Sequence, residues 1–318
     1  MKIVIPGGSG QVGTMLARVF QGEGMEVVVL SRTPQRAPWR IVAWDGATIG
    51  AWAAEIDGAD VVINLAGRSV NCRYGARNRR AILDSRVHST RAVGTAIARA
   101  QRPPRVWLQA STATIYAHRH DADNDEANGI LGGHEPNVPE TWRFSIAVAQ
   151  AWERAFDETV TPATRKVALR SAMTMSPDAG GIFATLLGLV RCGLGGPVGD
   201  GRQFVSWIHE EDFIHAIHWL IAHEELSGVV NLAAPHPLPQ TDFMRALRQA
   251  WGMPVGLPAP RWLLEIGTWL LRTESELILK SRRVVPARLG GSGFEFRYPH
   301  WPEAARHLCQ CWRNTARF

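Results

Sequence analysis

Residues 1–13 read MKIVIPGGSGQVG, and this stretch decides the fold. A short apolar run leads directly into the spacing G-x-x-G-x-x-G, and an amphipathic pattern follows it. Glycines there let the chain turn tightly behind a strand and approach a diphosphate, whose charge is met by the N–H groups and dipole of the next helix. Ordinary glycine-rich turns share the spacing, but the strand before it and the helix after it predict dinucleotide binding. The residues expected to contact the dinucleotide are Gly7, Gly10, Gln11, Val12 and Gly13.

The end of the second expected strand indicates which dinucleotide is bound. Residues 26–30 are followed by Ser31 and Arg32, with no acidic residue nearby. NAD sites usually place a carboxylate there for the ribose hydroxyls, whereas a guanidinium and a hydroxyl suit the 2′-phosphate of NADP. We therefore expect Ser31 and Arg32 to favour NADP over NAD. The alternative is an Arg32 that is solvated or stacks on adenine.

Short β-branched runs alternate with helical patterns over the first 235 residues. This alternation is typical of an α/β fold, a Rossmann-type parallel sheet with helices on both faces. The apolar spacing predicts helices around 12–20, 82–97 and 142–159, and another after Asp212. The expected strands are Lys2–Ile5, Glu26–Leu30, Arg40–Ala43, Asp60–Leu65, Arg105–Ala110, Lys166–Arg170 and Val229–Leu232.

Beyond Pro235 the sequence becomes rich in proline, and it contains a glycine-rich stretch at 290–293. This texture predicts a smaller C-terminal α+β cap packed on the sheet. We expect a Rossmann domain over 1–235, with 171–204 contributing to the cap, a substrate or cap lobe over 236–305, and a tail over 306–318.

Composition excludes several functional classes. No apolar run reaches the roughly 18 residues of a membrane span, and the first strand begins at Met1, so we expect a cytoplasmic protein without a signal peptide. The net charge is +6, but the basic residues are scattered, which argues against nucleic acid and allows an anionic small-molecule substrate. The four cysteines lack paired metal spacing, and no metal is expected. A homo-oligomer is compatible with the sequence but not specified by it.

Further segments resemble a known family. They are Asn64-Leu65-Ala66-Gly67, Asp84-Ser85-Arg86, Ala151-Trp152-Glu153, Leu194–Gln203, Ser206–His209 and Gly293–Pro299. Together with residues 7–13 they are similar to extended short-chain dehydrogenase/reductases of the NAD-dependent epimerase/dehydratase group, and most similar to an uncharacterised epimerase-like subfamily with its own C-terminal domain. The resemblance implies NADP binding at Ser31, Arg32, Leu65, Ala66 and Arg86, and we also expect Gly67 to contact the cofactor. The segment from Ser171 to Thr174 is expected to lie near the nicotinamide, because it follows the carboxyl end of a strand.

The catalytic pair of these enzymes is absent. They ordinarily carry a Tyr and, four residues later, a Lys that lowers the Tyr pKa and holds the ribose. Counting back from Ala151-Trp152-Glu153, the expected positions hold Ile146 and Gln150, and no lysine lies between Lys2 and Lys166. Ser111, at the end of the fifth strand, is expected to polarise the reacting oxygen, with Tyr116 or water handling the proton. Both residues have an equally simple structural role, as a strand-end hydroxyl and a packed phenol.

Arg202, Trp207 and His209 are expected to line a substrate cleft between cap and sheet, although His209 also fits a structural histidine. The sequence thus predicts an NADP-binding oxidoreductase or epimerase acting on an unidentified small molecule. The alternative is an inactive NADP-binding sensor or regulatory protein, which the absent Tyr-Lys pair favours. A sugar-nucleotide epimerase of ordinary mechanism fits less well, because it depends on that pair.

Overall fold

A computed structural model describes residues 1–258 and 279–315, and within them one parallel sheet of seven strands dominates. The strand order is β10-β6-β5-β4-β1-β2-β3, so the chain starts beside the central strand β4 and crosses over after β3. The strands are β1 (Lys2–Pro6), β2 (Glu26–Ser31), β3 (Arg40–Ala43), β4 (Val61–Asn64), β5 (Val106–Thr112), β6 (Arg165–Ser171) and β10 (Gly228–Leu232). Every strand expected from the sequence is present.

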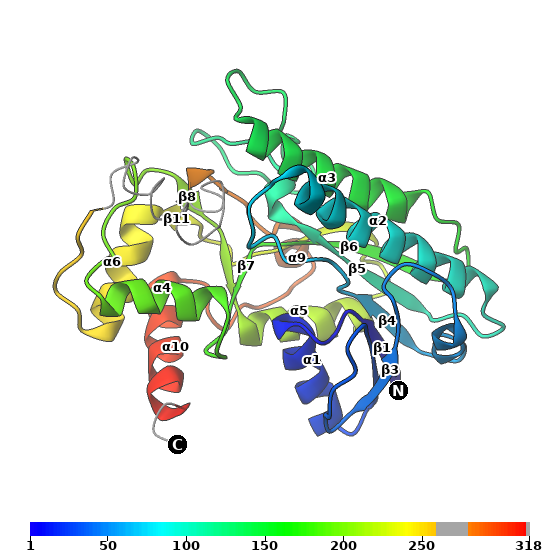
Figure 1. Ribbon diagram of the computed structural model, residues 1–318. Helices are drawn as coiled ribbons and strands as arrows, with labels where there is room; N and C mark the ends of the chain where they lie inside the picture. Colours follow the sequence, from blue (N-terminus) through cyan, green and yellow to red (C-terminus); the bar gives the residue numbers. More distant parts are fainter. Residues whose placement is uncertain (259–278, 316–318) are drawn as a thin grey trace.

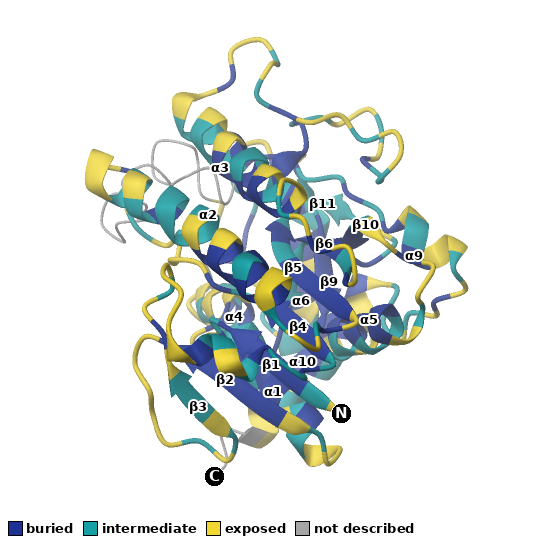
Figure 2. Cartoon of the chain, turned by 90° about the vertical axis from the view of Figure 1, so that its right-hand side faces the viewer, coloured by how far each residue is buried: buried dark blue, intermediate teal, exposed yellow. Residues whose placement is uncertain are grey.

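Both faces of the sheet are covered by helices because alternate residues of each buried strand point to opposite sides. Ile3 and Ile5 pack with Phe20 and Phe213 on one face, whereas Val4 packs on the other. Figure 1 shows the corresponding layers, with α1 (Gln11–Gly22) and α5 (Glu210–Ala222) below the sheet and α2 (Ala76–Arg99) and α3 (Glu140–Asp157) above it. In Figure 2, α2 and α3 present buried residues toward the sheet and exposed residues outward. The expected Rossmann-type fold is confirmed.

A second lobe lies beside the sheet (Figure 1). It contains α4 (Ile182–Arg191), α6 (Gln240–Trp251) and α10 (Trp301–Thr315), with two small sheets that pair β7 (Met173–Met175) with β9 (Trp207–His209) and β8 (Phe204–Val205) with β11 (Leu238–Pro239). Phe183 of α4, Phe243 of α6 and Trp301 of α10 share its apolar core. Among the described residues, η1 (Ala51–Glu55), η2 (Ala113–Ile115) and α9 (Ala287–Gly291) are short helical segments.

The C-terminal segment is not the tail expected from residue 306. Residues 301–315 form α10, and its Leu308 and Cys309 are fully buried. The sequence shows the reason: apolar residues recur at helical spacing after Trp301, and this face completes the core shared with α6. Among the described residues no helix combines the length and apolarity needed to cross a membrane.

Candidate cofactor and active site

The backbone around the glycine loop after β1 leaves no room for a side chain at Gly7 or at Gly13. Gly7 has φ +74°, and a Cβ there would lie 2.5 Å from Cα of Ala66; a Cβ at Gly13 would lie 2.3 Å from Cα of Gly8. The N–H of Gly7 donates to the carbonyl of Leu30 at 2.8 Å, which fixes the loop against the end of β2. Glycine is therefore required here by close backbone approach as well as by conformation.

A cavity of about 490 Å³ opens between this loop and the carboxyl ends of β2, β3 and β4. Seven of the residues expected to bind the cofactor line it: Gly7, Gly10, Ser31, Arg32, Leu65, Ala66 and Gly67. A Cβ at Gly10 would meet no atom nearer than 4.0 Å, so the space in front of the first turn of α1 is open. Parallel α/β sheets bind ligands in this position, beyond the carboxyl ends of the strands.

Two polar residues shape the β2 side of this cavity. Ser31 is buried, its Oγ accepts the N–H of Thr33, and it lies 3.1 Å from Oγ of Ser9. Arg32 is exposed, and its Cδ lies 3.8 Å from where a Cβ of Gly46 would be. The Cγ and Cδ atoms of Arg32 therefore lie against Gly46 at the wall of the cavity.

Asp45, which the sequence analysis missed, lines the same cavity from the β3 side. Its carboxylate accepts the Thr48 hydroxyl and the N–H groups of Ala47 and Thr48, at 2.8 and 2.9 Å for the two N–H groups. The Thr48 hydroxyl, followed by the two N–H groups, holds the Asp45 pKa below its ordinary value. The signal was available, because Asp45 begins an Asp-Gly turn two residues after the end of an expected strand.

The remaining expected cofactor residues lie outside this cavity. Val12 packs on the core, and a Cβ added at Gly181 would lie 2.1 Å from Nε2 of Gln11. Thr174 is half-buried in β7, in register with Ile208 of β9. Arg86 lies beneath the loop after β4, with its Cζ 3.3 Å from where a Cβ of Gly67 would be.

A second cavity, of about 110 Å³, lies at the carboxyl end of β5. Its polar lining comes from three parts of the chain: Tyr74 and Arg86 before and within α2, Thr112 and Thr114 at and just after the end of β5, and Ser145 of α3. The rest of the α3 wall is made by Val148, Ala149 and Trp152. Arg86 thus lies beside Gly67 of the first cavity and lines the second.

The α3 positions that face the second cavity differ by one residue from those expected. Ser145 and Ala149 line it, four residues apart and one turn before Glu153, whereas Ile146 and Gln150 do not. Cδ1 of Ile146 lies 2.9 Å from where a Cβ of Gly132 would be, so Ile146 packs against the 132–133 loop. One residue turns a helix by about 100°, which is enough to carry a side chain off the facing stripe. The Tyr-Lys pair is still absent, with Ser145 and Ala149 in its place.

Ser111 and Tyr116 do not line either cavity. Ser111 Oγ donates to Oε1 of Glu153 at 2.5 Å, and Nε and Nη2 of Arg170 hold the same carboxylate at 2.8 and 2.7 Å. The Tyr116 hydroxyl accepts from Nη1 of Arg170 at 2.9 Å and donates to Oδ1 of Asn231. Burial raises the Tyr116 pKa above its ordinary value. Both residues belong to a buried network, and the neighbouring Thr112 faces the cavity because strand residues alternate.

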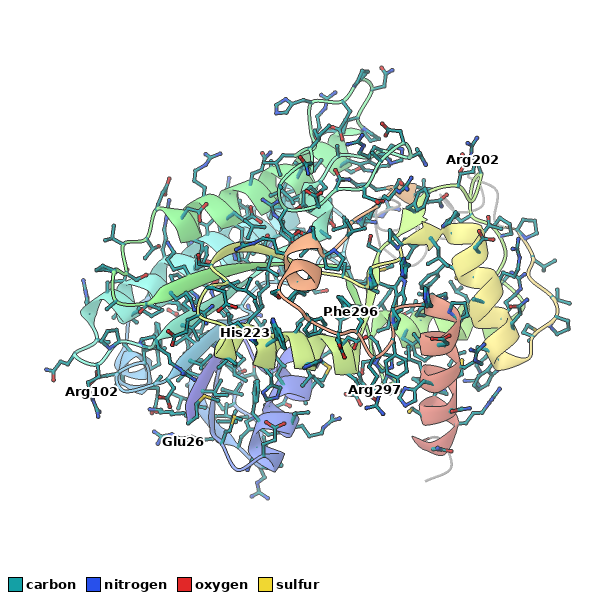
Figure 3. All side chains as sticks on the ribbon, turned by 180° about the vertical axis from the view of Figure 1, so that it is seen from behind. Glu26, Arg102, Arg202, His223, Phe296 and Arg297 are labelled. Carbon is teal, nitrogen blue, oxygen red and sulfur yellow. The ribbon has the colours of Figure 1, made fainter. Side chains whose placement is uncertain are left out.

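The expected substrate residues are also placed elsewhere. Figure 3 shows Arg202 pointing outward from the tip of a loop. Trp207 is fully buried, and its ring centroid lies 5.0 Å from that of Trp301. Trp207 therefore belongs to the core of the second lobe, and Arg202 faces solvent. Neither residue lines the two cavities at the sheet edge.

His209 is fully buried and caps the amino end of α5. Its Nδ1 accepts the N–H of Glu211, so its Nε2 carries the proton and donates to Nδ1 of His307 at 3.1 Å. Burial, followed by the neighbouring His307, lowers the His209 pKa to about 3. One ligand atom each from His209, Glu211 and His307 lie within 4.8 Å of one another. The proton on Nε2 of His209 favours a hydrogen-bonded pair over a metal site.

Comparisons with known proteins agree with this geometry. Residues 3–233 match the model of the NAD dependent epimerase/dehydratase family, and residues 259–308 match a domain of unknown function, DUF1731. The epimerase family protein SDR39U1 of Bos taurus is 30% identical over 312 residues, covering 97% of this chain and 99% of that protein.

Two solved structures are similar over the whole chain. The crystal structure of human epimerase family protein SDR39U1 with NADPH has a TM-score of 0.84 at 26% identity, covering 98% of this chain and 99% of that one. A nucleoside-diphosphate sugar epimerase from Corynebacterium glutamicum has a TM-score of 0.75 at 26% identity, covering 97% of this chain and 58% of that one. The resemblance read from the motifs is confirmed, and the chain belongs to the NAD dependent epimerase/dehydratase family.

Proposed function

We propose that this protein is an NADP-dependent oxidoreductase or epimerase-like enzyme acting on a small molecule. The observation that carries the proposal is the cavity of about 490 Å³ in front of α1, where Arg32 stands at the end of β2. A guanidinium there makes charge-assisted hydrogen bonds to a 2′-phosphate. The similar human protein was solved with NADPH, which supports the same choice of cofactor.

The residues present fit the dinucleotide at both ends of this cavity. Gly7 lets the loop pack against the backbone of Ala66, and Gly13 lets α1 pack against the backbone of Gly8. Gly10 leaves the space in front of the first turn of α1 open, so the N–H groups at the start of this helix can hold a diphosphate. The fixed carboxylate of Asp45 can accept a hydrogen bond from the exocyclic amine of adenine. Arg86 lies beside Gly67, and this position supports a role for it in holding the ribose nearer the nicotinamide.

When bound, NADPH would supply a hydride to a carbonyl carbon, or NADP would accept one from an alcohol carbon. In this chain Thr112, rather than Ser111, is the β5 hydroxyl directed at the reacting oxygen, because Thr112 lines the second cavity. Its Oγ1 accepts the N–H of Thr114, which leaves the hydroxyl hydrogen to be donated. Ser145 adds a second hydroxyl to the lining of this cavity, and the two hydroxyls favour a substrate group that contains oxygen.

A second function, a cofactor-binding sensor, is favoured by one observation: Ser145 and Ala149 stand where a Tyr and a Lys would face the cavity. The two functions differ in a direct assay. NADPH affinity is measured by calorimetry, and oxidation is then followed at 340 nm with aldehydes, ketones and sugar nucleotides. Turnover supports the enzyme, tight binding without turnover across the panel supports the sensor, and failure to bind NADPH contradicts both.

A further inference from the structure

A phenol and a guanidinium face the second cavity from the side opposite α3. Tyr74 precedes α2 and is 7% exposed; its ring centroid lies 5.1 Å from that of Phe144. Arg86 projects from α2 into the same cavity. The family's usual Tyr-Lys pair lies on α3. Tyr74 and Arg86 instead reach the same cavity from the α2 side.

Arg86 carries a half-buried positive charge, and its hydrogen-bond and ring partners among the described residues are neutral. Its Nη1 donates to the carbonyls of Arg68 and Ile82 at 3.0 and 3.1 Å, and its Cζ lies 5.0 Å from the ring of Trp152. Among residues 1–258 and 279–315 no carboxylate forms an ion pair with it. A cation removed from water costs free energy unless an anion compensates it. The cavity is therefore suited to a group that becomes negatively charged.

Arg86 and Tyr74 are electrostatically coupled. Burial lowers the Arg86 pKa to about 10, and the Tyr74 phenolate acts in the opposite direction. The guanidinium therefore remains protonated at neutral pH. By the same interaction it stabilises the phenolate of Tyr74 relative to the phenol.

The opposite wall leaves room for a substrate oxygen. Ser145 and Ala149 are short, and Thr112 has a hydroxyl hydrogen to donate. A phenol, a cation and a donating hydroxyl thus surround one cavity, which are the groups that carbonyl reduction requires. Val70, Phe144 and Val148 make the remaining lining apolar.

We propose that Tyr74 is the proton donor and Arg86 the cation of this active site, replacing from the α2 side the Tyr-Lys pair missing from α3. The proposal rests on the proposed function and names its substrate class: ketones or aldehydes, and the matching alcohols, whose oxygen enters the cavity beside Thr112. A volume of about 110 Å³ admits the reacting group and a short apolar substituent, so larger parts of the substrate remain outside.

The proton balance follows directly. A hydride from NADPH would form the new C–H bond at the carbonyl carbon, and the carbonyl oxygen, which becomes an alkoxide, would take the proton of Tyr74. The phenol O–H bond breaks, the alcohol O–H bond forms, and Arg86 balances the phenolate until water returns the proton. In the reverse direction the Tyr74 phenolate removes the proton of the alcohol.

A test that needs no substrate is ultraviolet titration of the phenols near 295 nm. The chain has three tyrosines, so the absorbance step lost in Tyr74→Phe assigns Tyr74. We expect the ionisation midpoint of this step to rise by at least about half a pH unit in Arg86→Met and to stay within that range in Arg86→Lys. Arg80→Met, an exposed arginine of the same helix, is the matched control and should leave it unchanged. A Tyr74 midpoint that does not respond to Arg86→Met overturns the proposal.

The second arm measures NADPH affinity and turnover separately, with circular dichroism confirming that each variant is folded. Tyr74→Phe should lower kcat by about 100-fold or more while the NADPH Kd changes less than twofold, because only the proton donor is lost. Tyr298→Phe is the matched control and should retain kcat. Full turnover by Tyr74→Phe overturns the proposal but leaves the proposed function intact. A wild-type protein that does not bind NADPH overturns the proposed function instead.

Discussion

Arg170 and Glu153 form a two-pronged ion pair inside the molecule, with Nε and Nη2 of Arg170 at 2.8 and 2.7 Å from the two carboxylate oxygens. Their side chains are 9% and 12% exposed. The pair joins α3 to β6, and Ser111 attaches to it from β5. This network holds the end of β5, and therefore Thr112, in position beside the second cavity.

Breaking this pair should destabilise the protein strongly. In Glu153→Gln the buried Arg170 loses its counter-charge, so we expect the free energy of unfolding to fall by about 3–5 kcal/mol in urea denaturation. Asp242→Asn, which removes the partner of Arg245 in a pair about half exposed, is the control and should cost less than about 1 kcal/mol. Equal effects of the two substitutions would show that the buried pair has no special role.

The close packing of the glycine loop predicts opposite outcomes for two glycines of α1. A Cβ at Gly13 would lie 2.3 Å from Cα of Gly8, whereas a Cβ at Gly22 would meet nothing within 4 Å. Gly13→Ala should therefore cost about 1–3 kcal/mol of stability and weaken NADPH binding, because the loop must shift. Gly22→Ala should be neutral in both measurements. Unchanged NADPH affinity in a folded Gly13→Ala protein would argue against a diphosphate at this loop.

The low pKa of His209 predicts that the folded protein loses stability in acid. Its pKa is about 3 in the folded protein against 6.5 as the ordinary value, so below about pH 6.5 the unfolded chain takes up a proton that the folded one does not. Stability should fall by about 1.4 kcal/mol per pH unit from this residue between pH 6.5 and 3. Urea denaturation of wild type and His209→Asn at pH 7.5 and 5.5 measures the difference. The wild type should lose more stability than the variant between these two pH values, and parallel losses would contradict the low pKa.

Much of the fold could be predicted because its signals are local. Buried parallel strands read as β-branched runs, and the glycine loop, Ser31 and Arg32 follow two of them directly. The cavity lined by Gly7, Ser31 and Ala66 followed from this placement. The cap was harder, because the partner of α10 is α6, about 50 residues earlier, and sequence spacing does not record that contact.

The second cavity could not be predicted for geometric reasons. Which side chains face the cavity depends on the exact position along each element. In β5, Thr112 lines the cavity and its neighbour Ser111 does not; in α3, Ser145 lines it and its neighbour Ile146 does not. Tyr74 and Arg86 belong to no sequence motif that indicates proton transfer. They line one cavity with Thr112 only because α2 packs beside β5 and α3. Motif spacing places a residue on an element but not on the correct side of it.

The most direct test of the central claim compares NADPH and NADH binding by calorimetry in wild type and Arg32→Ala. We expect wild type to prefer NADPH, and Arg32→Ala to weaken NADPH binding about 10- to 100-fold while leaving NADH binding unchanged, since a charge-assisted bond to the 2′-phosphate is worth about 1.5–3 kcal/mol. Equal affinity of the wild-type protein for the two cofactors, or an Arg32→Ala protein that binds NADPH as tightly as wild type, would contradict the account.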